Sequence, residues 1–164
     1  MKKILISALF FLSLFNNAIA KTEWYTETMP NGLAILTGVF TKSGIGLTFG
    51  CTGDFFSAGA MVLNTDKSGI QPNPMQIKVT APDNESANFI AEPIKSSPDL
   101  YTFMSSNAMA SLSTFHFLDT ANKKPLMIEL KNEKLSMNNK WIVDTTESGN
   151  AIKEFKKNCQ LINN

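Results

Sequence analysis

Cys51 and Cys159 are the only cysteines in this 164-residue sequence, and their spacing leaves open a reactive thiol, a metal ligand or a disulfide. Cys51 ends the segment GLTFGC, and Cys159 lies in the basic segment AIKEFKKNCQ. A reactive thiol needs cations beside the sulfur or a helix N-terminus, whereas Cys159 is expected at a helix C-terminus. The chain has a single histidine, so it lacks the ligands of a usual zinc site. A structural disulfide is the interpretation that these residues favour.

His116 is the only histidine, and Asp119 follows it three residues later. A histidine oriented by a carboxylate is a common general base, so a small hydrolase is one hypothesis. No serine lies in a Gly-x-Ser-x-Gly segment that would mark a nucleophile, and the surrounding TFHFLD is rich in aromatic residues. We therefore assign no catalytic residue and expect a protein that is not an enzyme.

Two further motifs resemble ligand sites only superficially. The glycines of GIGLTFG alternate with apolar residues as in a strand, and no Lys-Ser or Lys-Thr pair follows, unlike a phosphate-binding loop. In NTDKSG, Asn64 and Asp66 lack the ligand spacing of a calcium loop, which favours a simple turn. The sequence therefore predicts no metal and no cofactor.

The first twenty residues have the pattern of a secretory signal peptide. Two lysines precede an apolar run over 4–15, and Ala18-Ile19-Ala20 forms a small-x-small cleavage pattern. The run is shorter than the roughly 20 residues of a membrane span, so we expect no integral membrane segment after cleavage. The expectation is therefore cleavage after Ala20, export to the periplasm or beyond, and a single globular domain over 21–164.

The charge of the exported part narrows the class of partner. All fifteen basic residues are lysines; two lie in the signal, which leaves thirteen against fourteen acidic residues, a net charge of −1. This balance gives no electrostatic basis for binding nucleic acid. In an oxidising compartment, an even cysteine count predicts a disulfide, and in a monomer the pair must be Cys51–Cys159.

Alternating and turn-forming residues predict seven to nine short strands. Asn31-Gly32, both tolerant of positive φ, predict a hairpin between strands over 22–28 and 33–40. Alternation over 45–51 places Cys51 on the core face at the end of a third strand. Further strands are expected at 55–63, 75–80, 87–94 and 125–130, and around Trp141 and Val143.

Two helices complete the expected fold. Ser148 or a neighbour begins a helix over 149–160, whose buried stripe holds Ile152, Phe155 and Cys159 while its lysines face solvent. A second helix is favoured near 107–119 and capped by one of residues 105–107, although Phe115 and Phe117 are spaced as in a strand.

The apolar stripe of that second helix is expected to hold Ala108, Met109, Leu112 and Phe115. The fold class is therefore a β-rich α+β domain, a single antiparallel sheet or a sandwich, with its closing helix linked to the third strand.

The order of these features resembles a known group of exported proteins. Trp24 soon after the signal, the cysteine-ended strand GLTFGC and the segment WIVDTTESGNAIKEFKKNC are similar to small bacterial proteins of the type VI secretion-associated VasI type. They are also loosely similar to the invasion-associated locus B group. Ala151, Ile152, Phe155 and Cys159 match the closing helix of the first group. The resemblance implies a periplasmic, non-enzymatic accessory protein with a Cys51–Cys159 disulfide.

The first functional hypothesis is therefore an exported binding or accessory protein whose partner is another protein of the envelope or a secretion system. The alternative is an inhibitor of an envelope-active enzyme, such as a lysozyme or a protease, that uses the loop NTDKSGIQPNP or APDNES. A hydrolase built on His116 and Asp119 is the third hypothesis.

Overall fold

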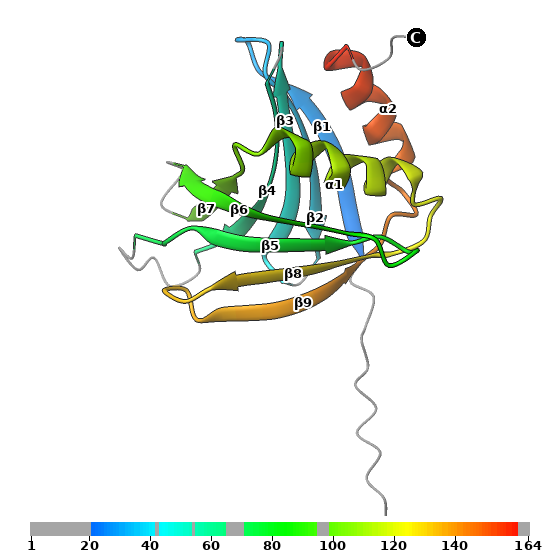
Figure 1. Cartoon of the computed structure of the whole chain (residues 1–164). Coiled ribbons are helices and arrows are strands. Elements are labelled where there is room, and N and C mark those ends of the chain that lie inside the picture. The colour runs from blue at the N-terminus through cyan, green and yellow to red at the C-terminus, as the bar shows by residue number, and fades with distance from the viewer. Residues whose placement is uncertain (1–20, 42, 54, 65–70, 95–98, 161–164) are drawn as a thin grey trace, which may run out of the picture.

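One antiparallel sheet of nine strands, covered by two helices, makes up the computed structural model, which describes residues 21–41, 43–53, 55–64, 71–94 and 99–160 (Figure 1). The strand order is β1-β2-β3-β4-β7-β6-β5-β8-β9. The strands are β1 (Thr22–Thr28), β2 (Ala34–Phe40), β3 (Ile45–Thr52), β4 (Phe55–Leu63), β5 (Met75–Thr80), β6 (Ser86–Ile94), β7 (Leu100–Met104), β8 (Leu126–Asn132) and β9 (Met137–Val143). The helices are α1 (Ala108–Thr120) and α2 (Gly149–Asn158). The predicted fold class is confirmed, whereas the predicted signal lies outside the described residues.

The sheet bends at β6, which belongs to both of its halves. The first part of β6 pairs with β5 as far as Ala91, and the last part, from Glu92 to Ile94, pairs with β7. In Figure 1 the strands β1 to β4 cross the direction of β5, β8 and β9, and α1 lies across the opening between the two halves. The concave side of this bent sheet holds the core.

Four phenylalanines join the sheet to both helices inside this core. Phe49 of β3 and Phe56 of β4 meet Phe115 of α1, with ring centroids 5.5 and 5.6 Å away. Phe155 of α2 lies 5.4 Å from Phe115 and 6.1 Å from Phe56. Edge-to-face contacts of this kind stabilise a core beyond the burial of area alone. The cluster therefore fixes the position of each helix against β3 and β4.

The outer strands of the sheet meet at one end. The Trp24 indole on β1 donates to the main-chain oxygen of Asp144, directly after β9, at 2.9 Å. The Asp144 amide in turn donates to Thr22 Oγ1 at 3.2 Å. The Trp24 ring lies over Gly38 of β2, where a glycine leaves room for it. These contacts close one end of the bent sheet.

The first hairpin confirms the predicted strand pair and refines its turn. Met29 donates its amide to the oxygen of Leu33, so the loop has three residues, 30–32. Only Gly32 has a positive φ, of 83°. Asn31 instead accepts the Leu33 amide with its side-chain oxygen.

Helix α1 is confirmed, with Asn107 as its cap, but of the predicted apolar stripe only Phe115 is buried. Met109 is 74% exposed and Leu112 40% exposed, while Ser111 and Thr114 are fully buried. Burial of these hydroxyls is tolerated because each has a hydrogen-bond partner. Ser111 accepts from the Ala58 amide, and Thr114 donates to Ala110 O.

Helix α2 has the predicted orientation, with Ile152 and Phe155 buried. Strand β7 was not predicted, because its five residues, LYTFM, show no clear alternation between apolar and polar types.

Replacing Gly38 by alanine tests the closure. The added Cβ would lie 2.7 Å from the Trp24 ring, so the ring and its bond to Asp144 must shift. We expect a loss of about 1 to 3 kcal/mol in the free energy of unfolding, measured by urea denaturation. Gly149→Ala is the matched control, because nothing lies near its added Cβ. Equal stability of the Gly38 variant and the parent would contradict this role.

Candidate interaction surface

Cys51 and Cys159 form the predicted disulfide, which links the end of β3 to the residue that follows α2. Their Cα atoms lie 5.9 Å apart, and 108 residues separate them in the sequence. Cys51 is buried and Cys159 is partly buried against the core. The pair therefore has a structural role and is not available as a free thiol.

Removing the disulfide should destabilise the fold. The chain-entropy model gives about 4 to 5 kcal/mol for a loop of this length, usually as an upper value. We expect the Cys51→Ala/Cys159→Ala double variant to unfold at a lower urea concentration. Its free energy of unfolding should fall by up to about 4 to 5 kcal/mol. The parent under reducing conditions is the control and should behave alike. Unchanged stability in both samples would exclude a structural role for the bond.

His116 and Asp119 both lie on the exposed side of α1, but the structure gives Asp119 a different partner. Asp119 Oδ2 accepts a hydrogen bond from Lys156 Nζ of α2 at 2.9 Å, forming an ion pair between the two helices. Among the described residues, no hydrogen bond joins the side chains of His116 and Asp119. His116 lines two hollows beside the turn between β5 and β6, of about 240 and 640 Å³.

The two loops singled out in the sequence differ in what can be described. Most of NTDKSG, including Asp66, lies outside the described residues. The turn APDNES is tightly bonded: Ala81 N donates to Glu85 O, and Glu85 N donates to Asp83 Oδ1. Asn84 adopts a positive φ of 74°. This turn is therefore ordered by its own hydrogen bonds. No group of three or more metal-ligating side chains occurs in the described ranges.

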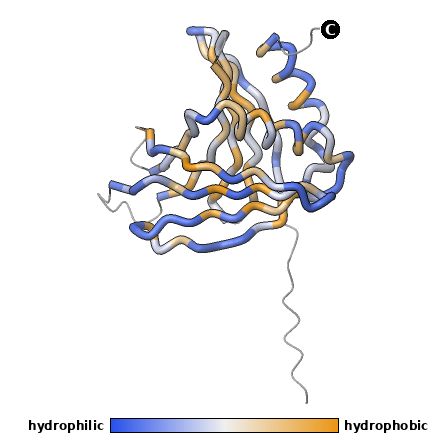
Figure 2. Tube along the Cα trace, in the orientation of Figure 1, coloured by the Kyte–Doolittle hydropathy of each residue, from blue (hydrophilic) through white to orange (hydrophobic). Residues whose placement is uncertain are grey.

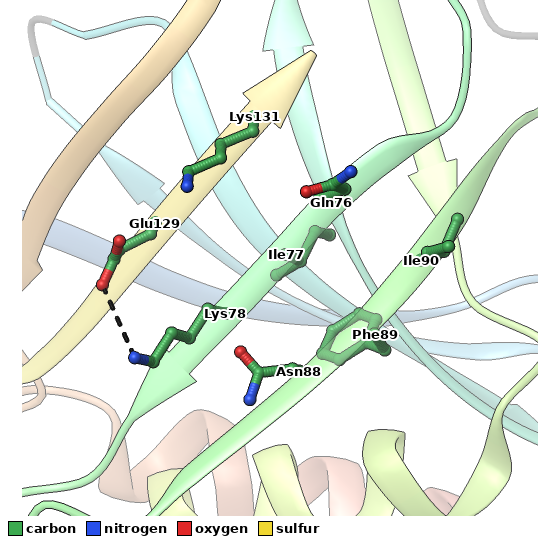
Figure 3. A pocket seen from close by; sticks show the side chains of 8 residues that line it. All are labelled: Gln76, Ile77, Lys78, Asn88, Phe89, Ile90, Glu129 and Lys131. Carbon is green, nitrogen blue, oxygen red and sulfur yellow. Dashed lines mark ion pairs between the residues drawn. The ribbon is translucent and has the colours of Figure 1, made fainter.

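The outer side of β5, β6 and β8 is an ordinary charged sheet surface. A hollow of about 300 Å³ lies there among Gln76, Lys78, Asn88 and neighbouring side chains (Figure 3). Glu129 lies 4.0 Å from Lys78 Nζ and 3.1 Å from Lys140 Nζ. Exposed ion pairs of this kind contribute little to stability, and their charges keep the surface in contact with water.

The outer side of the other half of the sheet carries no charge on its four central strands. Side chains alternate between faces, so the residues opposite the core can be identified from the register. They are Ile35, Thr37, Val39, Gly46, Thr48, Gly50, Thr52, Phe55, Ser57, Gly59, Met61, Leu63, Leu100, Thr102 and Met104. We call this set the uncharged face. Figure 2 colours the residues of both faces, and it shows apolar colours concentrated on β2 to β4 and mainly polar colours on β9.

Small residues and methionines pack tightly on the uncharged face. A Cβ at Gly46 would contact the methyl of Met61, and one at Gly50 would contact that of Met104, both at 3.5 Å. Thr37 and Thr48 are buried and share a hydrogen bond of 3.4 Å. Methionine adapts its shape readily and is common on surfaces that bind other proteins.

Large apolar side chains and carboxylates lie around this centre. Tyr25, Phe55, Leu63 and Ile94 are about half exposed, between 47% and 51%. The charged residues on the same side of β1 and β6 are all acidic: Glu23, Glu27 and Glu92. The face therefore has an uncharged centre, exposed apolar side chains around it and an acidic margin.

No family model, curated protein or solved structure matches this chain. No helix in the described part of the chain is long and apolar enough to cross a membrane.

The uncharged face was not recognised from the sequence, although a signal for it was present. The predicted strands over 33–40, 45–51 and 55–63 contain no charged residue at all. Such runs are typical of strands covered on both sides. Which residues lie side by side on the outer surface depends on strand order, and β7 was not predicted.

Proposed function

We propose that the protein is exported to the periplasm and acts there without catalysis, as a binding or accessory protein for another envelope or secretion-system protein. The observation that carries this proposal is the uncharged face. An antiparallel sheet with one face on the core normally turns polar side chains to water on the other. The strands β5, β8 and β9 follow that rule, while β2 to β4 and β7 do not.

The composition of the face suits a protein partner. Interface centres are depleted in charged residues and enriched in aromatic residues and methionine. Contiguous exposed apolar patches on a folded protein commonly mark interaction sites. The threonines, glycines and adaptable methionines of this face offer an uncharged contact area to a protein partner.

The acidic margin indicates the charge expected on the partner's surface. Complementary charge favours a protein that surrounds its own apolar contact with lysine or arginine, beside Glu23, Glu27 and Glu92. A second copy docked face to face would bring carboxylates together in a symmetric contact, which disfavours self-association through this face.

Lysine substitutions on the face should weaken binding. We expect Tyr25→Lys and Ile94→Lys each to weaken the complex at least about tenfold, because each places a charge in the apolar contact. Met109→Lys is the matched control, since Met109 is exposed and apolar but lies on α1. A photo-crosslinking residue at Met61 should capture the partner in envelope extracts, and the purified pair then gives the affinities. Crosslinks only to a second copy, or equal loss with Met109→Lys, would contradict the proposal.

Inhibition of an envelope-active enzyme is the second candidate, favoured by the ordered turn over 81–85. Its internal bonds prepare an acidic loop for insertion into a site, as rigid inhibitors do. In this case Asp83→Asn/Glu85→Gln should reduce inhibition of a lysozyme or protease while Tyr25→Lys leaves it unchanged. The opposite pattern would assign function to the uncharged face.

A further inference from the structure

The early end of β7 leaves part of β6 without a neighbouring strand. β7 pairs with β6 only from Glu92 to Ile94, and after Met104 the chain leaves the sheet for α1. The first part of β6 pairs with β5 on one side only. Within the described ranges, no strand lies along its other side.

Hydrogen-bond alternation shows which main-chain groups point to this open side. Ala81 N donates to Glu85 O, so these two residues form a hydrogen-bonded pair of the β5–β6 ladder. Paired residues alternate along an antiparallel ladder, so Ala87 and Phe89 also bond to β5. Ser86, Asn88 and Ile90 therefore turn their N–H and C=O groups away from β5.

The neighbouring part of β4 also has no strand beside it, but its main-chain groups have other hydrogen-bond partners. Ala58 N donates to Ser111 Oγ of α1 at 2.9 Å, and Ala58 O accepts from Ser105 N at 2.9 Å. The helix thus takes the place of a strand for β4. No hydrogen bond joins α1 to the main chain of Ser86, Asn88 or Ile90 among the described residues.

A groove lies between α1 and the start of the open side of β6, where Ser86 and Ala87 line it. Its volume is about 640 Å³, and Ala87, Ala110, Leu112 and Phe117 form its apolar walls. Glu85 and His116 lie at the end where the second hollow, of about 240 Å³, continues toward Asp83 and Lys124. A strand edge on one side and a helix on the other form the type of groove that accepts an extended peptide.

We propose that this groove binds an extended internal segment of a partner polypeptide by strand addition to β6. The segment runs antiparallel to β6 along its open side. It exchanges hydrogen bonds with Ser86 inside the groove and with Asn88 and Ile90 beyond it. An apolar side chain packs against Leu112. The C-terminal part of the segment approaches Glu85, so it carries lysine or arginine there rather than a free carboxylate.

The wall formed by α1 selects a single extended segment over the edge of a folded sheet. A second copy that added β6 to β6 would have to bring its own helix into the same space. The site is separate from the uncharged face and does not depend on the function proposed for that face.

Hydrogen exchange with defined peptides tests the proposal. The exported, oxidised protein is mixed with two pools of acetylated, amidated peptides of about eight residues, alternating aliphatic and threonine, which end in two lysines or in two glutamates. We expect tighter binding of the lysine pool and at least about tenfold slower exchange of the Ser86, Asn88 and Ile90 amides on binding. Protection of these amides in the free protein equal to that of Ala87 and Phe89 would overturn the proposal. So would protection that rises with protein concentration as dimers form.

A matched pair of proline variants tests the strand addition itself. Asn88→Pro removes one free N–H without touching the ladder to β5. Asn138→Pro removes the equivalent outward N–H of β9, whose bonds to β8 follow the same alternation. We expect the first to weaken lysine-pool binding at least about tenfold and the second to leave it unchanged. Equal affinities of both variants would overturn the proposal.

If Asn88→Pro fails to fold, a change of charge at the end of the groove tests the proposal instead. Glu85→Lys should reverse the preference between the two pools. An unchanged preference would overturn the proposal.

Discussion

The fold depends on the contact of four phenylalanine rings, because β3, β4 and both helices meet there. Phe115 alone touches partners on β3, β4 and α2. A sheet bent this strongly leaves a wide concave side, and side chains smaller than phenylalanine would leave it partly empty, at a cost of several kcal/mol for each large truncation. The cluster holds α1 against β4, and so determines where the helix leaves β6 open.

The sequence was most informative where a single physical rule operates. Alternation placed Cys51 on the core face of β3, and the spacing of Ile152 and Phe155 oriented α2, because each of these elements buries one apolar side. Gly32 marked the first turn because the chain needs a positive φ there. Cysteine counting gave the disulfide, since only two partners exist.

The sequence was misleading where polar groups are satisfied inside the protein. Helix α1 exposes Met109 and buries Ser111, because that hydroxyl bonds the edge of β4 and hydropathy alone does not record such a partner. The failure to predict strand β7 had a larger consequence. It joins the two halves of the sheet, so neither the uncharged face nor the groove beside β6 can be assembled without it.

The two surfaces lie on different sides of the sheet. The uncharged face covers the outer side of β2 to β4, whereas the groove opens beside α1 on the inner side. A partner on one leaves the other accessible, so one molecule has the geometry to hold a folded protein and an extended segment together. The charged outer surface of β5, β8 and β9 lies beyond β6 in the strand order and keeps that part of the sheet in contact with water.

The disulfide also has a consequence for how the chain matures. On the proposed export route the chain crosses the membrane from its N-terminus, so Cys51 arrives 108 residues before its partner Cys159. Until then its thiol is open to mixed disulfides with other proteins. The disulfide within the chain therefore forms only once nearly all of the chain has crossed. An oxidised chain is one in which the end of β3 and the end of α2 have come into contact.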